Sequence, residues 1–247
     1  MTDGLLLLHA FPLSHEMWAP QVEAFGGRLP VVAPDDPGFG GTPPAAAEGW
    51  MDAAADQAAA ALKAAGVDRA VVVGLSMGGY VAFSFWRRHP SMVAGLVLAN
   101  TRSGADPDQA KEGRAALAAR LRAEGNGFLA DSPPPLLSES PPAGLLERVQ
   151  EIIRKQPAEA IAGAALGMAG RVDSTPDLAG ITVPTLIVTS TGDRLIPADA
   201  TSPMATQIPG ASLIVIGDAG HLSNLEAASQ FNNAVEVLIK RAGVTLK

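Results

Sequence analysis

A serine flanked by glycines stands between an apolar run and a helical pattern in the segment Ala70-Val71-Val72-Val73-Gly74-Leu75-Ser76-Met77-Gly78-Gly79. The apolar run predicts a buried strand, and Met77–His89 predicts a helix that ends before Pro90. Glycines next to the serine allow a sharp turn, and the helix N-terminus offers backbone N–H groups to a developing oxyanion. Among 26 glycines this spacing alone would fit an ordinary turn. The strand–turn–helix setting instead predicts a nucleophile elbow with Ser76 as nucleophile.

Short apolar runs alternate with helical patterns on both sides of this segment. That alternation predicts an α/β fold with a parallel sheet between two helical layers. The expected strands are Leu5–Leu8, Val31–Ala33, Ala70–Gly74, Leu96–Ala99, Thr185–Thr189 and Ser212–Ile216. The expected helices include Glu16–Phe25, Met51–Ala65, Met77–His89 and Leu225–Arg241.

The interval Ser103–Asp173 contains helical patterns, Gln109–Glu124 and Leu145–Lys155, but no strand pattern. We therefore expect a core made of residues 1–102 and 174–247, interrupted by a helical insertion of residues 103–173. Proline cannot continue a helix, so the two proline clusters within 132–142 are expected to be hinges. A proline-rich linker between two separate domains is the alternative.

Composition limits the classes of function. A net charge of −7 and the lack of a basic stripe argue against nucleic acid as a partner. Without cysteine the chain has no disulfide, thiolate metal site or cysteine nucleophile. No segment has the length of a membrane span or the pattern of a signal peptide. We expect a cytoplasmic protein without membrane contact.

A serine nucleophile needs a base, and the chain has four histidines. His89 lies at a predicted helix C-terminus, where a structural role is expected, and His15 has no supporting pattern. His221 follows the last predicted strand, at the same sheet edge as Ser76. We interpret His221 as the general base; the alternative is a histidine that caps a glycine turn.

The base in turn needs a carboxylate that fixes its tautomer. Asp193 follows the strand Thr185–Thr189 and gives the chain order serine, acid, histidine. Some relatives place the acid one strand earlier, but Asn100 stands there. Asp199 and Asp218 stay open as alternatives to Asp193.

These motifs, with Asp35-Asp36-Pro37-Gly38-Phe39-Gly40-Gly41-Thr42 and His221-Leu222-Ser223-Asn224-Leu225-Glu226, resemble the α/β-hydrolase superfamily. They are typical of the branch that contains 3-oxoadipate enol-lactonases, small carboxylesterases and cofactor-free serine haloperoxidases or perhydrolases. The usual N-terminal hairpin has no counterpart before Leu5, so we expect six strands, all parallel. The edge strand thus left exposed would allow a partner to cover it, and a homo-oligomer stays open.

An oxyanion hole needs two backbone N–H groups near the serine, and Met77 supplies one. The resemblance of Leu8-His9-Ala10-Phe11-Pro12 to the family's His-Gly-x-Pro loop implies Phe11 as the second donor. Ala10 stands where the family has a glycine. The family glycine allows an unusual backbone angle that alanine tolerates less well. The resemblance also implies that the insertion 103–173 is a lid and that no metal or organic cofactor is needed.

The predicted function is hydrolysis of small carboxylic esters through an acyl-serine, with short, uncharged esters preferred. The alternative is hydrolysis of a lactone or enol-lactone that carries a carboxylate, bound by Arg102 or Arg171; we favour a solvated surface role for both. Trp18 is a candidate substrate contact, with a core position as the alternative. Perhydrolase or haloperoxidase chemistry and a non-catalytic ligand receptor are less favoured readings of the same scaffold.

Overall fold

A computed structural model describes all residues 1–247. Its centre is one sheet of six parallel strands in the order β2-β1-β3-β4-β5-β6. The strands are β1 (Asp3–Leu8), β2 (Val31–Val32), β3 (Arg69–Leu75), β4 (Val93–Ala99), β5 (Thr185–Ser190) and β6 (Ser212–Ile216). The predicted six-stranded parallel sheet is confirmed, although the edge strand β2 is only two residues long.

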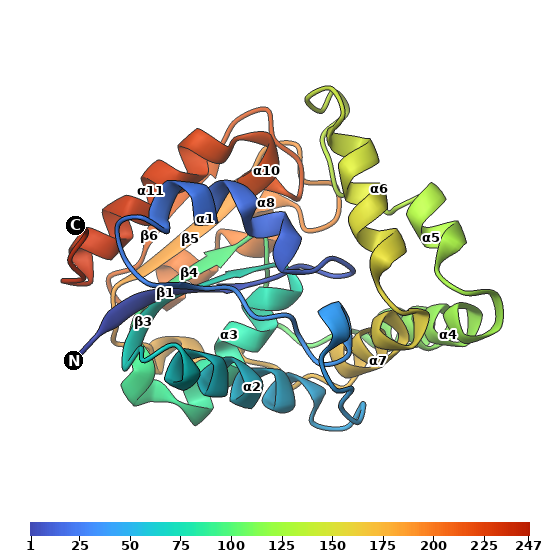
Figure 1. Ribbon diagram of the computed structural model, residues 1–247, viewed down its shortest axis with the longest axis horizontal. Coiled ribbons are helices and arrows are strands. Elements are labelled where there is room, and N and C mark those ends of the chain that lie inside the picture. Colours follow the sequence, from blue (N-terminus) through green and yellow to red (C-terminus); the bar gives the residue numbers. More distant parts are fainter.

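Helices cover both faces of the sheet (Figure 1). One layer contains α1 (Ala19–Phe25), α10 (Ser223–Glu226) and α11 (Ala228–Arg241), and the other contains α2 (Trp50–Ala64) and α3 (Met77–Arg88). Strands β1, β3 and β4 are buried between these layers and therefore read as continuous apolar runs, whereas the edge strand β6 is largely exposed.

Two expected helices are divided in the structure. The stretch 16–25 begins as a 3₁₀ turn, His15–Trp18, and continues as α1 with Pro20 in its first turn. The stretch 225–241 is split at Ala227, whose non-helical backbone (φ −125°, ψ 48°) separates α10 from α11. Short elements complete the core: the 3₁₀ turns Phe39–Gly41, Pro90–Met92 and Thr175–Gly180, and the helices α8 (Ala198–Thr201) and α9 (Met204–Gln207).

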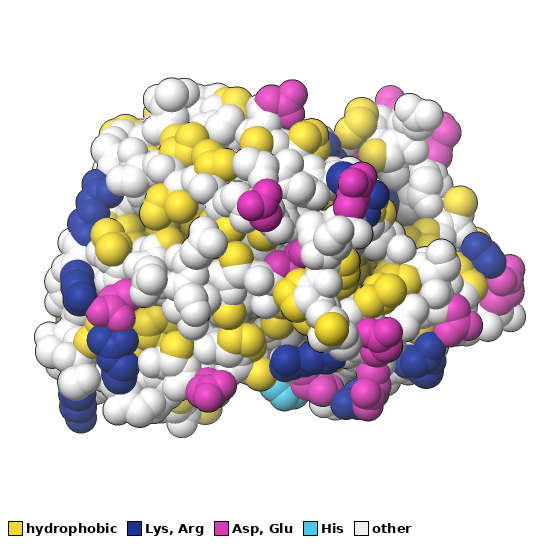
Figure 2. Space-filling model, turned by 90° about the horizontal axis from the view of Figure 1, so that it is seen from above, with side chains coloured by type: hydrophobic (Ala, Val, Ile, Leu, Met, Phe, Trp, Pro, Cys, Tyr) yellow, Lys and Arg dark blue, Asp and Glu magenta, His cyan; other side chains and the backbone are white.

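The connection from β4 to β5 contains four helices that lie together at one end of the molecule (Figure 1). They are α4 (Asp108–Glu124), α5 (Gly127–Asp131), α6 (Leu145–Lys155) and α7 (Ala158–Ala169). We call residues 103–173 the helical insertion. The face seen in Figure 2 carries both acidic and basic side chains on this end of the molecule. None of the helices in the chain combines the length and apolar character required to cross a membrane.

The strand order places a switch point between β1 and β3. From β1 the chain moves to β2 on one side, whereas β3, β4, β5 and β6 follow one another on the other side. Loops that leave neighbouring strands in opposite directions open a crevice at their carboxyl ends, where ligands bind in such sheets. Leu8 pairs with Gly74 at this position, so the loops after β1 and β3 both begin there.

Candidate active site

Ser76 occupies a strained turn between β3 and α3. Its backbone angles are φ 58° and ψ −115°, in a region that residues other than glycine rarely adopt. A Cβ on Gly74 would lie 2.3 Å from the backbone oxygen of Gly78, and one on Gly78 would lie 2.0 Å from that of Leu8. These two glycines are therefore required by close backbone contacts, and the turn presents Ser76 at the carboxyl edge of the sheet.

His221 and Asp193 come from loops after β6 and β5 and form a buried pair. His221 Nδ1 lies 2.8 Å from Asp193 Oδ2. The other oxygen, Oδ1, accepts hydrogen bonds of 2.9 Å from the backbone N–H groups of Leu195 and Ile196. The carboxylate accepts at this position, so Nδ1 of His221 carries the proton and Nε2 is left as the ring nitrogen able to accept one.

Asn100 fixes the same carboxylate from the end of β4. Its Nδ2 donates to Asp193 Oδ2 at 2.9 Å and to Ser190 Oγ at 2.8 Å, while its Oδ1 accepts from Ser223 Oγ at 2.7 Å. Burial raises the pKa of Asp193, but hydrogen bonds and charge from His221, with bonds from Ile196 and Asn100, bring it below its ordinary value. Asp193 is therefore an anion at neutral pH.

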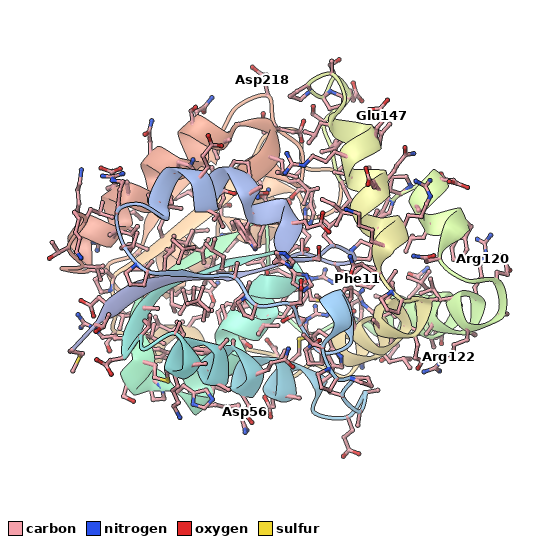
Figure 3. All side chains as sticks on the ribbon, in the orientation of Figure 1. Phe11, Asp56, Arg120, Arg122, Glu147 and Asp218 are labelled. Carbon is pink, nitrogen blue, oxygen red and sulfur yellow. The ribbon has the colours of Figure 1, made fainter.

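The other histidines and acids considered from sequence lie elsewhere. His15 and His89 pair with Asp35 and Asp56 near the surface. The alternative acids Asp199 and Asp218 are exposed, and neither contacts His221. Figure 3 shows Asp218 at the outer edge of the molecule.

The loop after β1 brings Phe11 to the site. Ala10 is not among the residues with positive φ, so alanine at this position carries no backbone penalty. His9 is fully buried: its Nδ1 lies 3.1 Å from the Ala10 oxygen, and its Nε2 accepts the Asp36 backbone N–H at 3.0 Å. The backbone N–H of Phe11 has no protein acceptor. His9 thus holds the loop in place, and a donor remains beside the serine.

Asp36 is a buried carboxyl next to this loop. Burial raises its pKa from 3.8 to about 6, with the charge of His9 opposing the shift and that of Asp35 adding to it. Its Oδ2 has no hydrogen-bond partner and lies 3.4 Å from His9 Nε2. Ionising Asp36 therefore costs more free energy in the folded protein than in the unfolded chain.

One cavity of about 350 Å³ contains both Ser76 and His221. It lies between the core and the helical insertion, and Phe11 is at this boundary in Figure 3. The core contributes Phe11, Ser76, Tyr80, Arg102, Leu195, Ile196 and His221, and the insertion contributes Arg114, Leu117, Leu129, Pro134, Leu136 and Met168. Most of these side chains are apolar, as in small-molecule sites generally.

Several residues named from sequence do not line this cavity. Trp18 is fully buried against Phe231, with ring centroids 6.1 Å apart, and is a core residue. Met77 is also fully buried, so only its backbone N–H is relevant to the site. Arg171 is buried too, with its guanidinium 4.0 Å from the Tyr80 ring centroid. Of the two arginines expected, the structure brings only Arg102 to the cavity.

Two polar cavity residues, Tyr80 and Arg114, were missed by sequence reasoning, as were the individual apolar residues of the wall. Tyr80 lies in the first turn of α3, four residues after Ser76, and its closeness in sequence to the predicted nucleophile could have identified it. Arg114 lies on α4, a helix with charged residues on most of its surface. No local pattern distinguishes it from solvated arginines.

Comparisons with known proteins identify the family of the chain. Residues 5–234 match the model of the alpha/beta hydrolase family. A pimeloyl-[acyl-carrier protein] methyl ester esterase from Aromatoleum aromaticum is 30% identical, over 88% of this chain and 90% of its own. A 3-oxoadipate enol-lactonase from Acinetobacter baylyi is 25% identical, over 96% and 89%.

Among solved structures, a thermophilic esterase from Thermogutta terrifontis with malate bound is similar. It is 37% identical, with a TM-score of 0.91, over 98% of this chain and 90% of its own. The family match spans nearly the whole chain, and the relatives share its length as well as its fold. The protein is therefore a member of the alpha/beta hydrolase family.

Proposed function

We propose that the protein hydrolyses small carboxylic esters through an acyl-serine intermediate. The observation that carries the proposal is the shared cavity of Ser76 and His221, with Asp193 bonded to the far side of the imidazole. Esterases among the similar proteins support the reaction class. A cavity of about 350 Å³ is at the small end of ligand sites, which favours small substrates.

The proposed reaction uses each group in turn. Ser76 Oγ attacks the ester carbonyl carbon while its proton passes to His221 Nε2, and Asp193 stabilises the resulting imidazolium. The N–H groups of Phe11 and Met77 stabilise the oxyanion of the tetrahedral intermediate. The imidazolium then protonates the departing alkoxide. Water, activated by the same imidazole, hydrolyses the acyl-serine and regenerates the enzyme.

The helical insertion acts as the lid in this proposal. It supplies the wall opposite the serine, including Leu117, Leu129 and Leu136. The insertion also contacts the histidine loop directly, because the Leu222 N–H donates to the Leu136 oxygen at 2.9 Å. A substrate is therefore enclosed between core and insertion beside His221.

Lactone hydrolysis is the second candidate, because it uses the same attack on an acyl carbon. The similar enol-lactonase from Acinetobacter baylyi supports it. In a lactone the leaving alkoxide stays attached to the acyl group, so the cavity must hold the whole ring and its substituents.

Two measurements test the proposed chemistry. A fluorophosphonate should label Ser76, located by peptide mass spectrometry, and Ser76→Ala should abolish both labelling and p-nitrophenyl acetate turnover. Ser84→Ala is a matched control, because Ser84 is buried on the same helix but outside the cavity. Labelling at another serine, or full turnover by Ser76→Ala, would overturn the proposal.

A further inference from the structure

Three arginines surround one buried carboxylate at the edge of the active-site cavity. Asp106 Oδ1 lies 2.6 Å from Arg102 Nη2 and 2.8 Å from Arg171 Nη1, and its Oδ2 accepts from Arg114 Nε. Burial raises the pKa of Asp106, but the hydrogen bond and charge of Arg114, with those of Arg171, bring it below its ordinary value. One negative charge therefore faces three positive charges.

Both Nη groups of Arg171 bond to other parts of the protein. Its guanidinium donates to the backbone oxygens of Met168 and Gly104, at 2.9 and 2.8 Å, and lies over the Tyr80 ring. Its side chain is 3% exposed. With Asp106 it forms a buried support behind the cavity wall, and the excess positive charge rests with the other two arginines.

Arg102 and Arg114 both line the cavity that contains Ser76. Arg114 contacts Asp106 through Nε alone, and its two Nη groups have no protein acceptor. Arg102 uses Nη2 for Asp106, while its Nε is buried without a partner. The two side chains thus hold several N–H donors unused beside the nucleophile. Arg102 is 34% exposed, so it is partly solvated, as favoured from sequence, and it also lines the cavity.

Arg102 and Arg114 are 34% and 22% exposed, so part of each side chain is already withdrawn from water, and their two positive charges in a largely apolar cavity favour an anion as ligand. A neutral ester would take water from the guanidinium groups and return neither charge nor acceptor atoms. A carboxylate matches the planar fork of a guanidinium and accepts charge-assisted hydrogen bonds from it. The apolar side chains Leu117, Leu129 and Met168, also in the wall, suit a short methylene chain.

From this we infer that the substrate is an ester or lactone that carries a free carboxylate, bound by Arg102 and Arg114. Asp106 and Arg171 position the two arginines. The inference rests on the proposed hydrolase function and deepens it by naming the substrate class. It replaces the preference for uncharged esters expected from sequence.

Matched substrates test the inference. The kcat/KM of monomethyl adipate is compared with that of dimethyl adipate, which has the same chain without the charge. A second arm compares γ-butyrolactone with its carboxymethyl derivative and so distinguishes an ester from a lactone as the source of the carboxylate. Wild-type enzyme should favour the charged member of at least one pair by more than roughly tenfold.

Substitutions test whether Arg102 and Arg114, and not the overall charge of the protein, cause the preference for a charged substrate. Arg114→Gln and Arg102→Gln should each lower the charged-to-neutral ratio by roughly ten- to a hundredfold. Arg114→Lys keeps the charge without the fork and should fall between. Arg120→Gln should leave the ratio unchanged: Arg120 is also on α4, but pairs with Glu124 on the outer side of the molecule, away from the cavity (Figure 3). Because a ratio is measured, partial unfolding of a variant does not affect the result.

A binding assay separates this inference from the proposed function. Calorimetry should show adipate binding to Ser76→Ala and weaker binding, again by roughly ten- to a hundredfold, to Ser76→Ala/Arg114→Gln. If adipate binds in this way but wild-type enzyme turns over no ester, the hydrolase function is refuted and the carboxylate site is supported. Turnover of neutral esters with a ratio of one or less, unchanged by Arg114→Gln, would overturn the carboxylate site and leave the hydrolase standing.

Discussion

Asp193→Asn changes one atom at the point where four hydrogen bonds meet. Asp193 Oδ1 accepts from the backbone N–H groups of Leu195 and Ile196, and Oδ2 accepts from His221 and Asn100, all at 2.8–2.9 Å. A carboxylate accepts at both oxygens, whereas an amide accepts at one end and donates at the other. One of the two pairs of donors must therefore face a new donor.

The orientation that keeps the backbone bonds places the new NH₂ group against His221 Nδ1 and the Asn100 amide. His221 relieves this contact by moving its proton to Nε2, where it can no longer accept one from Ser76. The expected loss in kcat is about 10⁴-fold, or about 5.5 kcal/mol of barrier. The donor facing Asn100 should cost a further 1–3 kcal/mol, approximately, in the free energy of unfolding.

Turnover of p-nitrophenyl acetate and the thermal midpoint, measured together, check both magnitudes. Because the pKa of Asp193 is held below its ordinary 3.8, the wild-type carboxylate stays charged throughout any assay near neutral pH. Asp199→Asn is the control, since Asp199 is exposed at the start of a nearby helix. Wild-type turnover by Asp193→Asn would refute the reasoning and move the acid to another residue.

Three other sets of substitutions test separate parts of the structure. Ser76→Ala and His221→Ala should each lower turnover by several orders of magnitude, and the double variant should be hardly slower, because both act in one proton transfer; additive losses would contradict this. Burial raises the pKa of Asp36 from 3.8 to about 6, so wild type should lose up to about 3 kcal/mol of unfolding free energy relative to Asp36→Asn as the pH rises through that window. Denaturant titrations across the window check this, and a constant difference would exclude it. Gly78→Ala should lose about 1–3 kcal/mol in the same assay, because its Cβ would lie 2.0 Å from a backbone oxygen of β1. Gly113→Ala, on α4 with open space around it, should gain about 0.5–1 kcal/mol, and equal losses at both glycines would contradict the steric argument.

The centre of the sheet was predictable because its strands β1, β3, β4 and β5 are buried on both faces. Burial of this kind produces apolar runs that stand out from the helices between them, as in β3 and β4. Helix α7 shows the limit of pattern reading: it is rich in alanine and buried on most sides, so it lacks the polar face that marks a helix in sequence. No element was assigned to residues 158–169 for this reason.

The positions of Ser76, Asp193 and His221 at one sheet edge also followed from sequence, because each stands just after a predicted parallel strand. Their contacts did not follow. Asn100 illustrates the difference: the sequence showed only that it was not an acid, whereas the structure shows it bonded to Asp193, Ser190 and Ser223. Networks of this kind join loops that are about 90 to 120 residues apart, and no local spacing encodes them.

The charge of the cavity wall depends on still longer-range information. Arg102 precedes α4, Arg114 lies on α4 and Arg171 follows α7, and each alone resembles a solvated surface arginine. Asp106 assigns them different roles, because one carboxylate can neutralise only one of the three charges it touches. Arg171 is closed off by backbone oxygens and the Tyr80 ring, so the uncompensated charge remains where Arg102 and Arg114 meet the cavity. The proposed carboxylate site therefore depends on how many arginines surround one buried acid, and that number is set only once the insertion is folded against the core.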